Sequence, residues 1–141
     1  MENCIFCKII NGEIPAYKIY EDEDLLAFLD KYPINPGHTL VVPKNHAETV
    51  IECPDNILEK IMPAVKKIMF ALRKAVNPDG FNLLSNNGEV SGQEIMHYHM
   101  HIIPRFSGDE KEYAIKELFK SAKELPENEM KTIYSNILKY I

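Results

Sequence analysis

Three histidines alternate with apolar residues about two thirds of the way along the chain, and this run constrains the fold more than any other feature. They are His97, His99 and His101, separated by Tyr98 and Met100. Alternate side chains of a β-strand point to the same face. The run therefore predicts a strand over residues 95–104 with three imidazoles on one face. Packing alone seldom requires such a row, so the run indicates a functional site.

The remaining regular elements are expected from residue composition and apolar spacing. Four further strands are predicted over residues 17–22, 25–30, 38–44 and 81–87, and a short helical turn follows Cys4. Apolar residues repeat at helical spacing over 55–76, where Pro63 should either kink the helix or mark its start. This order of elements predicts an α+β fold with a mainly antiparallel sheet.

The composition changes to a charged segment after residue 107. Two amphipathic helices are predicted there, with apolar faces running from Ile115 to Leu125 and from Met130 to Ile141. Their polar faces mix Glu with Lys and lack the basic excess that anionic lipid favours. We therefore expect these helices to pack on the core of the same domain.

The length and charge of the chain narrow the classes of partner. At 141 residues and 45% hydrophobic residues it fits one folded domain. The net charge of −5 disfavours a nucleic-acid partner, and no apolar stretch is long enough to cross a membrane. Glu2 and the absence of a basic N-terminal region argue against a secretory signal. The odd count of three cysteines argues against a disulfide scaffold, so a cytoplasmic protein is expected.

Two functional interpretations of the histidine run compete. One is a catalytic metal bound by three histidines, and the other is a neutral imidazole that attacks phosphorus and forms a covalent intermediate. The loop before the run contains Asn86-Asn87-Gly88 and Ser91-Gly92-Gln93, which offer amides, a hydroxyl and close backbone approach for phosphate oxygens. This context favours the nucleophile, and Arg105 is expected to add positive charge.

The run His97-Tyr98-His99-Met100-His101-Ile102-Ile103 resembles the signature of the histidine-triad (HIT) superfamily of nucleotide hydrolases and transferases. Segments 86–105 and 29–46 also resemble that family, and the N-terminal segment is similar to its microbial members. The resemblance covers residues 3–106. It implies a HIT domain over 1–106, and the two predicted helices of 107–141 lie outside it. From their apolar faces we expect 107–141 to be a C-terminal helical extension packed on the same domain. The resemblance also implies an α+β fold with a five-stranded antiparallel sheet and one long helix, usually in a homodimer.

The resemblance also implies a role for each site residue. His99 would be the nucleophile toward the α-phosphorus, the carbonyl of His97 would orient its ring, and His101 would contact phosphate. His38 matches an additional histidine behind the triad. The nucleotide-binding positions are Asn86, Gly92 and Gln93 on the phosphate side, Asp30 at the ribose hydroxyls, and Ile10 and Phe28 at the base.

The pair Cys4 and Cys7 forms a C-x-x-C motif that by itself fits either redox chemistry or a metal. Only three residues precede Cys4, which leaves no room for the strand of a thioredoxin-like unit, and tetrahedral zinc needs two more ligands. The resemblance implies that His46 and His97 supply them. Four protein ligands leave no open position, so the Zn²⁺ would be structural. Cys53 is expected to be a free thiol.

The resemblance leaves several activities open. We expect a purine nucleoside phosphoramidase that acts on an AMP-type substrate. The alternatives are a dinucleoside polyphosphate hydrolase, a nucleotidyl transferase and a non-enzymatic nucleotide-binding interaction protein. Few cations lie near the motifs, mainly Lys44 and Arg105, so an amine leaving group is favoured over a polyphosphate. Glu94 stands where the eukaryotic phosphoramidase branch has a serine.

Overall fold

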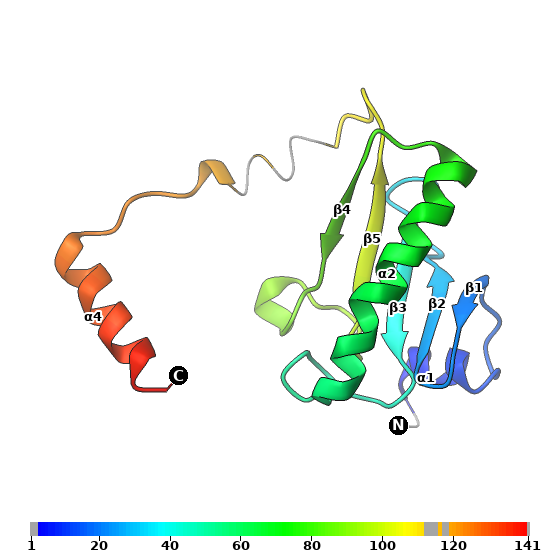
Figure 1. The fold of residues 1–141 in the computed structure, drawn as a ribbon, viewed down its shortest axis with the longest axis horizontal. Helices are drawn as coiled ribbons and strands as arrows, with labels where there is room; N and C mark the ends of the chain where they lie inside the picture. Colours follow the sequence, from blue (N-terminus) through cyan, green and yellow to red (C-terminus); the bar gives the residue numbers. More distant parts are fainter. Residues whose placement is uncertain (1–2, 112–115, 117–118, 141) are drawn as a thin grey trace. The chain divides into compact units, whose positions relative to one another are not determined.

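The computed structural model describes residues 3–111, 116 and 119–140. The chain divides into two compact units, Met1–Ser107 and Gly108–Ile141 (Figure 1). The first unit contains the whole sheet and every site residue expected from the sequence. The expected packing of the second unit on the first stays a prediction.

The first unit is built on a five-stranded antiparallel sheet in the order β1-β2-β3-β5-β4. This confirms the α+β fold and the strand number that the family resemblance implies. The strands are β1 (Lys18–Glu21), β2 (Leu25–Leu29), β3 (Thr39–Pro43), β4 (Gly80–Leu84) and β5 (Met100–Arg105).

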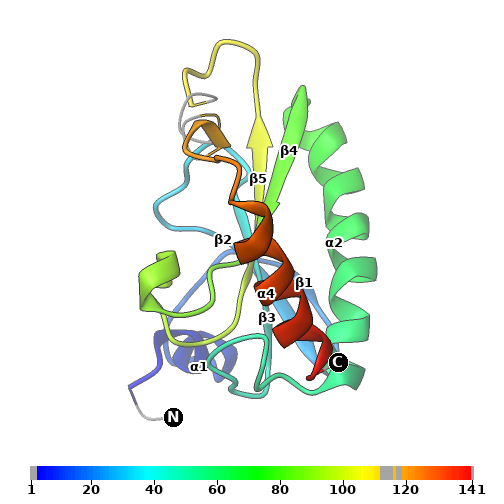
Figure 2. The same cartoon turned by 90° about the vertical axis from the view of Figure 1, so that its left-hand side faces the viewer.

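Helices cover both faces of the sheet, α2 (Asp55–Val76) on one side and the short α1 (Ile5–Ile10) on the other (Figure 2). Because both faces are covered, β2 is apolar at successive positions rather than at alternate ones. Leu25, Ala27 and Val41 pack toward α2. On the other face Leu26, Phe28, Leu40 and Val42 pack with Phe6 and Ile9 of α1.

Helix α2 is continuous from Asp55 to Val76 and passes through Pro63, so the interpretation of Pro63 as its start is wrong. Pro63 lies on the exposed side of the helix. The helix is followed by Asn77 in the left-handed conformation, a common stop for helices. Its buried residues lie at helical spacing against the sheet: Ile57, Ile61, Ala64, Val65, Ile68 and Leu72.

The strand predicted over residues 95–104 is shorter than expected, because β5 begins only at Met100. The β3–β5 register pairs Val41 with Met100. If the ladder continued for two more residues, Pro43 would lie opposite Tyr98. Proline has no N–H to donate to the ladder. The Tyr98 amide instead donates to Ala47 O, and His97 and His99 precede the strand.

In the second unit, α4 (Glu127–Leu138) confirms a helix within the second predicted amphipathic segment. The first predicted helix, over 115–125, lies in part outside the described residues. Among the helices of the described residues, none has the length and apolar character needed to cross a membrane.

Candidate functional site

The N-terminal helix places two cysteines on one side of the sheet. Cys4 precedes α1 and Cys7 lies in its first turn, where residues three apart share a helix face. The Cys7 amide donates to Cys4 Sγ at 3.4 Å. Phe6 and Ile9 of the same helix pack against β2 and β3, so the anchoring of α1 fixes both sulfurs.

Two histidines meet these sulfurs. His97 Nδ1 lies 3.3 Å from Cys4 Sγ and 3.6 Å from Cys7 Sγ, and His46 Nδ1 lies 3.4 Å from Cys7 Sγ. Since a carbonyl oxygen can only accept, His97 Nε2 must donate to Pro43 O, 2.8 Å away. The neutral ring of His97 therefore presents a lone pair on Nδ1 to the two sulfurs.

This Cys/His cluster fits a tetrahedral zinc ion. Its four donor atoms all lie within 4.8 Å of one another. Bonds of about 2.3 Å to sulfur and about 2.0 Å to nitrogen would put sulfur and nitrogen about 3.5 Å apart in a tetrahedron, close to the separations seen. Burial raises the pKa of the Cys7 thiol, and the neighbouring Cys4 raises it further. A bound cation such as zinc would favour the thiolate form of Cys7.

His99 has its ring fixed by the backbone of His97. Its Nδ1 lies 2.7 Å from the His97 carbonyl oxygen, which can only accept, so the ring hydrogen is on Nδ1. The lone pair is therefore on Nε2. Phe6 packs its ring against those of His97 and His99 in edge-to-face contacts, with centroids 5.8 and 5.2 Å apart. The His99 ring is thus packed against Phe6, and the hydrogen bond to His97 O gives it one defined tautomer.

His38 and His101 form a hydrogen-bonded pair beside His99. The Ile34 amide donates to His38 Nδ1 at 3.0 Å, which places the hydrogen of the neutral His38 ring on Nε2. His38 Nε2 then donates to His101 Nδ1 at 2.9 Å. His101 consequently carries its own hydrogen on Nε2. The ring centroids of His99 and His101 lie 4.9 Å apart.

Asp30 completes a second group of potential metal ligands with His38 and His101, but the hydrogen bonds disfavour a metal there. Coordination through His38 Nε2 would move the ring hydrogen to Nδ1, where it would face the Ile34 N–H. Asp30 Oδ2 lies 3.6 Å from His38 Nε2, and its other oxygen accepts from the Tyr32 amide. The group is a chain of hydrogen bonds, unlike the Cys/His cluster.

Burial is the main influence on the protonation of these rings. It lowers the pKa values of His38 and His99, and it lowers those of His97 and His101 to about 4. The carboxylate of Asp30 opposes the effect on His38, His99 and His101 without cancelling it. All four rings are therefore neutral at pH 7, as the tautomers above require.

Hydrogen bonds connect the loop before the triad to the segment that carries His46. Gln93 is buried and its side chain is fully engaged, since Nε2 donates to Glu48 O and Ile95 O while Oε1 accepts from the Gly88 amide. The His97 amide also donates to Ile95 O. In the structure Gln93 thus shapes the loop, and its expected contact with phosphate stays a prediction.

The other expected nucleotide-binding residues fall into two places. Asn86 Nδ2 donates to Gly92 O at 3.3 Å, and Gly92 has a positive φ of 97° that suits glycine. Phe28 is buried in edge contact with Phe6, and the partly buried Ile10 packs in the same apolar cluster. The structure therefore brings Ile10 and Phe28 to the side of the sheet that carries His99.

Some contributors to the site carry no recognisable motif. The histidines are fixed by the Pro43 carbonyl, the Ile34 amide and the Phe6 ring. Of these three groups, only Phe6 had a signal in the sequence, namely its position inside the C-x-x-C motif. Arg105 lies at the far end of β5, about 13 Å along the strand from His101, and donates to Asn82 Oδ1. Its expected contribution to phosphate binding is not supported by this position.

Comparison with known proteins agrees with the pattern of the site. The model of the HIT domain matches residues 11–108. The chain is 56% identical over 105 residues to Protein hit of Bacillus subtilis, covering 74% of this chain and 72% of the relative. It is 46% identical over 103 residues to adenosine 5'-monophosphoramidase hnt1 of Schizosaccharomyces pombe, covering 73% and 74%. It is 47% identical over 107 residues to adenylylsulfatase HINT3 of Arabidopsis thaliana, covering 76% and 54%.

Solved structures give the same result. A HIT family member from Bacillus subtilis aligns with a TM-score of 0.83 at 44% identity, covering 99% of this chain and 97% of that one. A zinc-bound histidine triad family protein from Mycobacterium smegmatis aligns with a TM-score of 0.73 at 37% identity, covering 77% and 79%. The chain therefore belongs to the HIT family, the family of nucleotide-binding hydrolases that its histidine pattern resembles.

Proposed function

We propose that this protein hydrolyses an AMP-type nucleotide at the α-phosphorus through a covalent nucleotidyl intermediate on His99. The observation that carries the proposal is the 2.7 Å hydrogen bond from His99 Nδ1 to the His97 carbonyl. It leaves the lone pair of a neutral imidazole on Nε2, which is the atom required of a nucleophile at pH 7.

The reaction would proceed in two displacements. His99 Nε2 attacks phosphorus, the bond from phosphorus to the leaving group breaks, and the leaving group takes a proton from solvent. Water then attacks the nucleotidyl-imidazole, loses a proton to solvent and releases the nucleotide and neutral His99. His101, with its hydrogen on Nε2, would donate to a phosphate oxygen as charge develops.

Two relatives support an adenosine nucleotide as the substrate. Their names describe an adenosine 5'-monophosphoramidase and an adenylylsulfatase. Both activities fit attack at the phosphorus of an adenylyl group, with a different group leaving. We favour the phosphoramidate, because Lys44 is paired with Glu21 at 3.0 Å and Arg105 lies at the far end of β5. A polyphosphate leaving group would need cations that are nearer.

A structural zinc ion is proposed for the Cys/His cluster of Cys4, Cys7, His46 and His97. When bound, it would cross-link the N-terminal helix region to His46, which follows β3, and to His97, the first histidine of the triad. All four donors belong to the protein, so the metal would have no open position for substrate. The chemistry at phosphorus is left to His99 and His101.

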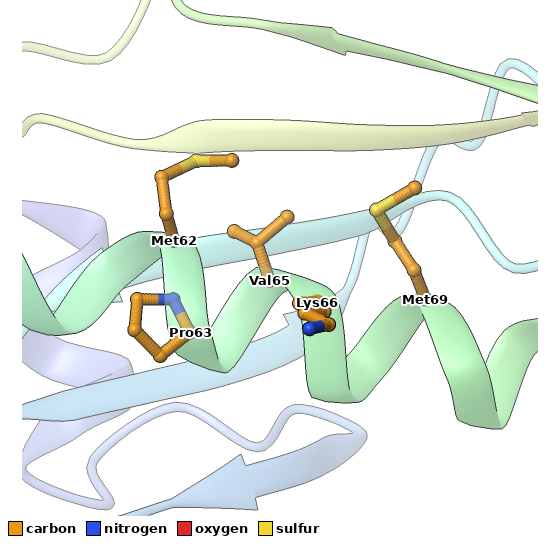
Figure 3. Close-up of a pocket in the computed structure, with 5 residues that line it drawn as sticks. All are labelled: Met62, Pro63, Val65, Lys66 and Met69. Carbon is orange, nitrogen blue, oxygen red and sulfur yellow. The ribbon is translucent and has the colours of Figure 1, made fainter.

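We also propose a homodimer formed through α2 and β4. Met62, Pro63, Val65, Lys66 and Met69 line a shallow hollow of about 540 Å³ on α2, where Met62, Val65 and Met69 extend to the same side of the helix (Figure 3). Met62, Phe70 and Leu83 are exposed apolar residues, and Leu83 pairs with Ile102, which faces α2. β4 is also an edge strand.

Light scattering on the wild type and on Phe70→Glu tests the proposed homodimer. A monomeric wild type would contradict it.

Turnover of adenosine 5'-monophosphoramidate tests the proposed function. The wild type should release AMP and ammonia, and diadenosine polyphosphate assayed in parallel should be the poorer substrate. Binding of AMP without turnover of any of the nucleotides would instead favour the interaction protein. Faster cleavage of the diadenosine compound would favour the polyphosphate hydrolase.

A further inference from the structure

The loop between β2 and β3 is organised around the ring and backbone of His38. Asp30 N donates to His38 O at 2.9 Å, and His38 N donates to Asn35 O at 3.1 Å. The Ile34 amide donates to the ring at Nδ1. The loop therefore surrounds His38 with its own backbone groups, and one of them selects the ring tautomer.

One side chain ties this loop to β5. Asn35 is only 6% exposed, and its Nδ2 donates to Pro104 O at 2.9 Å. The next glycine, Gly37, has a φ of +88°, and a Cβ there would lie 3.1 Å from Leu72 and 3.2 Å from Pro104. The loop is therefore seated closely on β5 and α2. β5 also carries His101, which receives the hydrogen bond from His38.

We propose that Asn35 is a positioning residue for the reaction proposed above. By tying the loop to Pro104, it holds the Ile34 amide against His38 Nδ1. His38 is then restricted to the tautomer that donates from Nε2, and His101 to the tautomer that presents Nε2–H. Asn35 touches neither of the reacting atoms and acts through Ile34, His38 and His101.

The sheet alone does not account for this arrangement. The β3–β5 ladder pairs Thr39 with Ile102 and Leu40 with His101, so it fixes the backbone beside His38. A backbone position does not choose between the two tautomers of a neutral ring, because either nitrogen can carry the hydrogen. The choice is made by the Ile34 N–H, whose place depends on the loop that Asn35 anchors.

The test is a measurement of ring tautomers by long-range ¹H–¹⁵N correlation spectra of the zinc-loaded, full-length protein at pH 8, without nucleotide. In the wild type, His38 and His101 should each show a protonated Nε2 and an unprotonated Nδ1. Asn35→Asp keeps the shape of the side chain but replaces the donating amide with an acceptor. It should introduce the second tautomer in His38 and His101 while the His99 ring keeps its Nδ1 hydrogen.

Kinetics of the same variants separate positioning from a general loss of structure. Asn35→Asp should lower kcat about tenfold, since small displacements of catalytic groups are costly, with KM nearly unchanged. Asn56→Asp makes the same change on the exposed first turn of α2 and should leave both constants and all tautomers as in the wild type. Ile34→Pro removes the amide hydrogen itself and should reproduce the mixed tautomers, which keeps the test valid if Asn35→Asp does not fold.

Wild-type rings with the opposite tautomers would overturn the inference, as would Asn35→Asp or Ile34→Pro with wild-type tautomers. This result is independent of turnover. A protein with the expected tautomers and no hydrolytic activity would contradict the proposed function, while the inference that Asn35 fixes the tautomers of His38 and His101 would still hold.

Discussion

The two histidine clusters of this protein use the same side chain in opposite ways. In the Cys/His cluster, His97 presents a bare Nδ1 to the sulfurs of Cys4 and Cys7, and its ring lies against that of His46. In the other cluster, His38 and His101 share a hydrogen, and the Ile34 amide fixes its position. Nitrogen and sulfur lone pairs that converge on one point indicate a metal site. Ring nitrogens that each accept a hydrogen indicate a hydrogen-bonded relay, here the chain from the Ile34 amide through His38 to His101.

His97 connects the Cys/His cluster to His99. The ring of His97 belongs to the Cys/His cluster, and its carbonyl oxygen accepts the hydrogen bond that orients His99, the proposed nucleophile. The proposed metal site and the proposed reactive site therefore share His97. Substitutions should separate them, because the ring acts in one cluster and the carbonyl in the other.

His99→Ala should produce the largest effect on activity. It removes the nucleophile, so kcat/KM should fall by about 10³-fold or more, while affinity for AMP and the zinc content stay close to those of the wild type. Steady-state kinetics, calorimetric titration and elemental analysis measure the three. A variant that keeps more than a few per cent of the wild-type rate would remove His99 from the role of nucleophile.

Cys7→Ser should have the reverse profile. Loss of a thiolate ligand should abolish the one zinc ion expected per chain and lower the free energy of unfolding by several kcal/mol, with a smaller effect on turnover of the molecules that remain folded. Cys53→Ser is the matched control, because Cys53 is also buried and lies outside the cluster. Equal zinc contents in the two variants would contradict the metal assignment.

Low pH should weaken the relay through His101. Its pKa falls from 6.5 to about 4 on burial, so the unfolded chain binds more protons between these values. The contribution of His101 to the free energy of unfolding should therefore be constant above pH 6.5 and decrease as the pH falls toward 4. Denaturant titrations at pH 7.5 and 5 should show a smaller decrease for His101→Asn. An identical pH dependence in the two proteins would show that His101 contributes nothing.

Glu94→Ser should have the smallest effect. The exposed Glu94 carboxylate follows Gln93 and should repel a polyphosphate more than a phosphoramidate. Its removal should narrow the preference for the phosphoramidate by about two- to threefold, as expected for a screened surface charge. Parallel kinetics at matched ionic strength measure this ratio. Glu59→Ser, on the exposed side of α2, should leave the ratio unchanged.

The sequence predicted the elements of the site better than the contacts between them. Helical spacing located α2, and the alternation of the triad separated His97, His99 and His101 from Tyr98 and Ile102 even though β5 starts later. The tether from Asn35 to Pro104 and the engagement of Gln93 by Glu48 join residues far apart in the chain. They depend on strand register and loop closure, which no local pattern encodes.

The central claim is the covalent bond at His99, and trapping it is the most direct measurement. Wild-type protein mixed with adenosine 5'-monophosphoramidate should be quenched during turnover in denaturant at alkaline pH, digested and examined by mass spectrometry. We expect one adenylyl group on the peptide that contains His99, and none in His99→Ala treated in the same way. Turnover without an adduct in the wild type, or an adduct that survives in His99→Ala, would contradict the account.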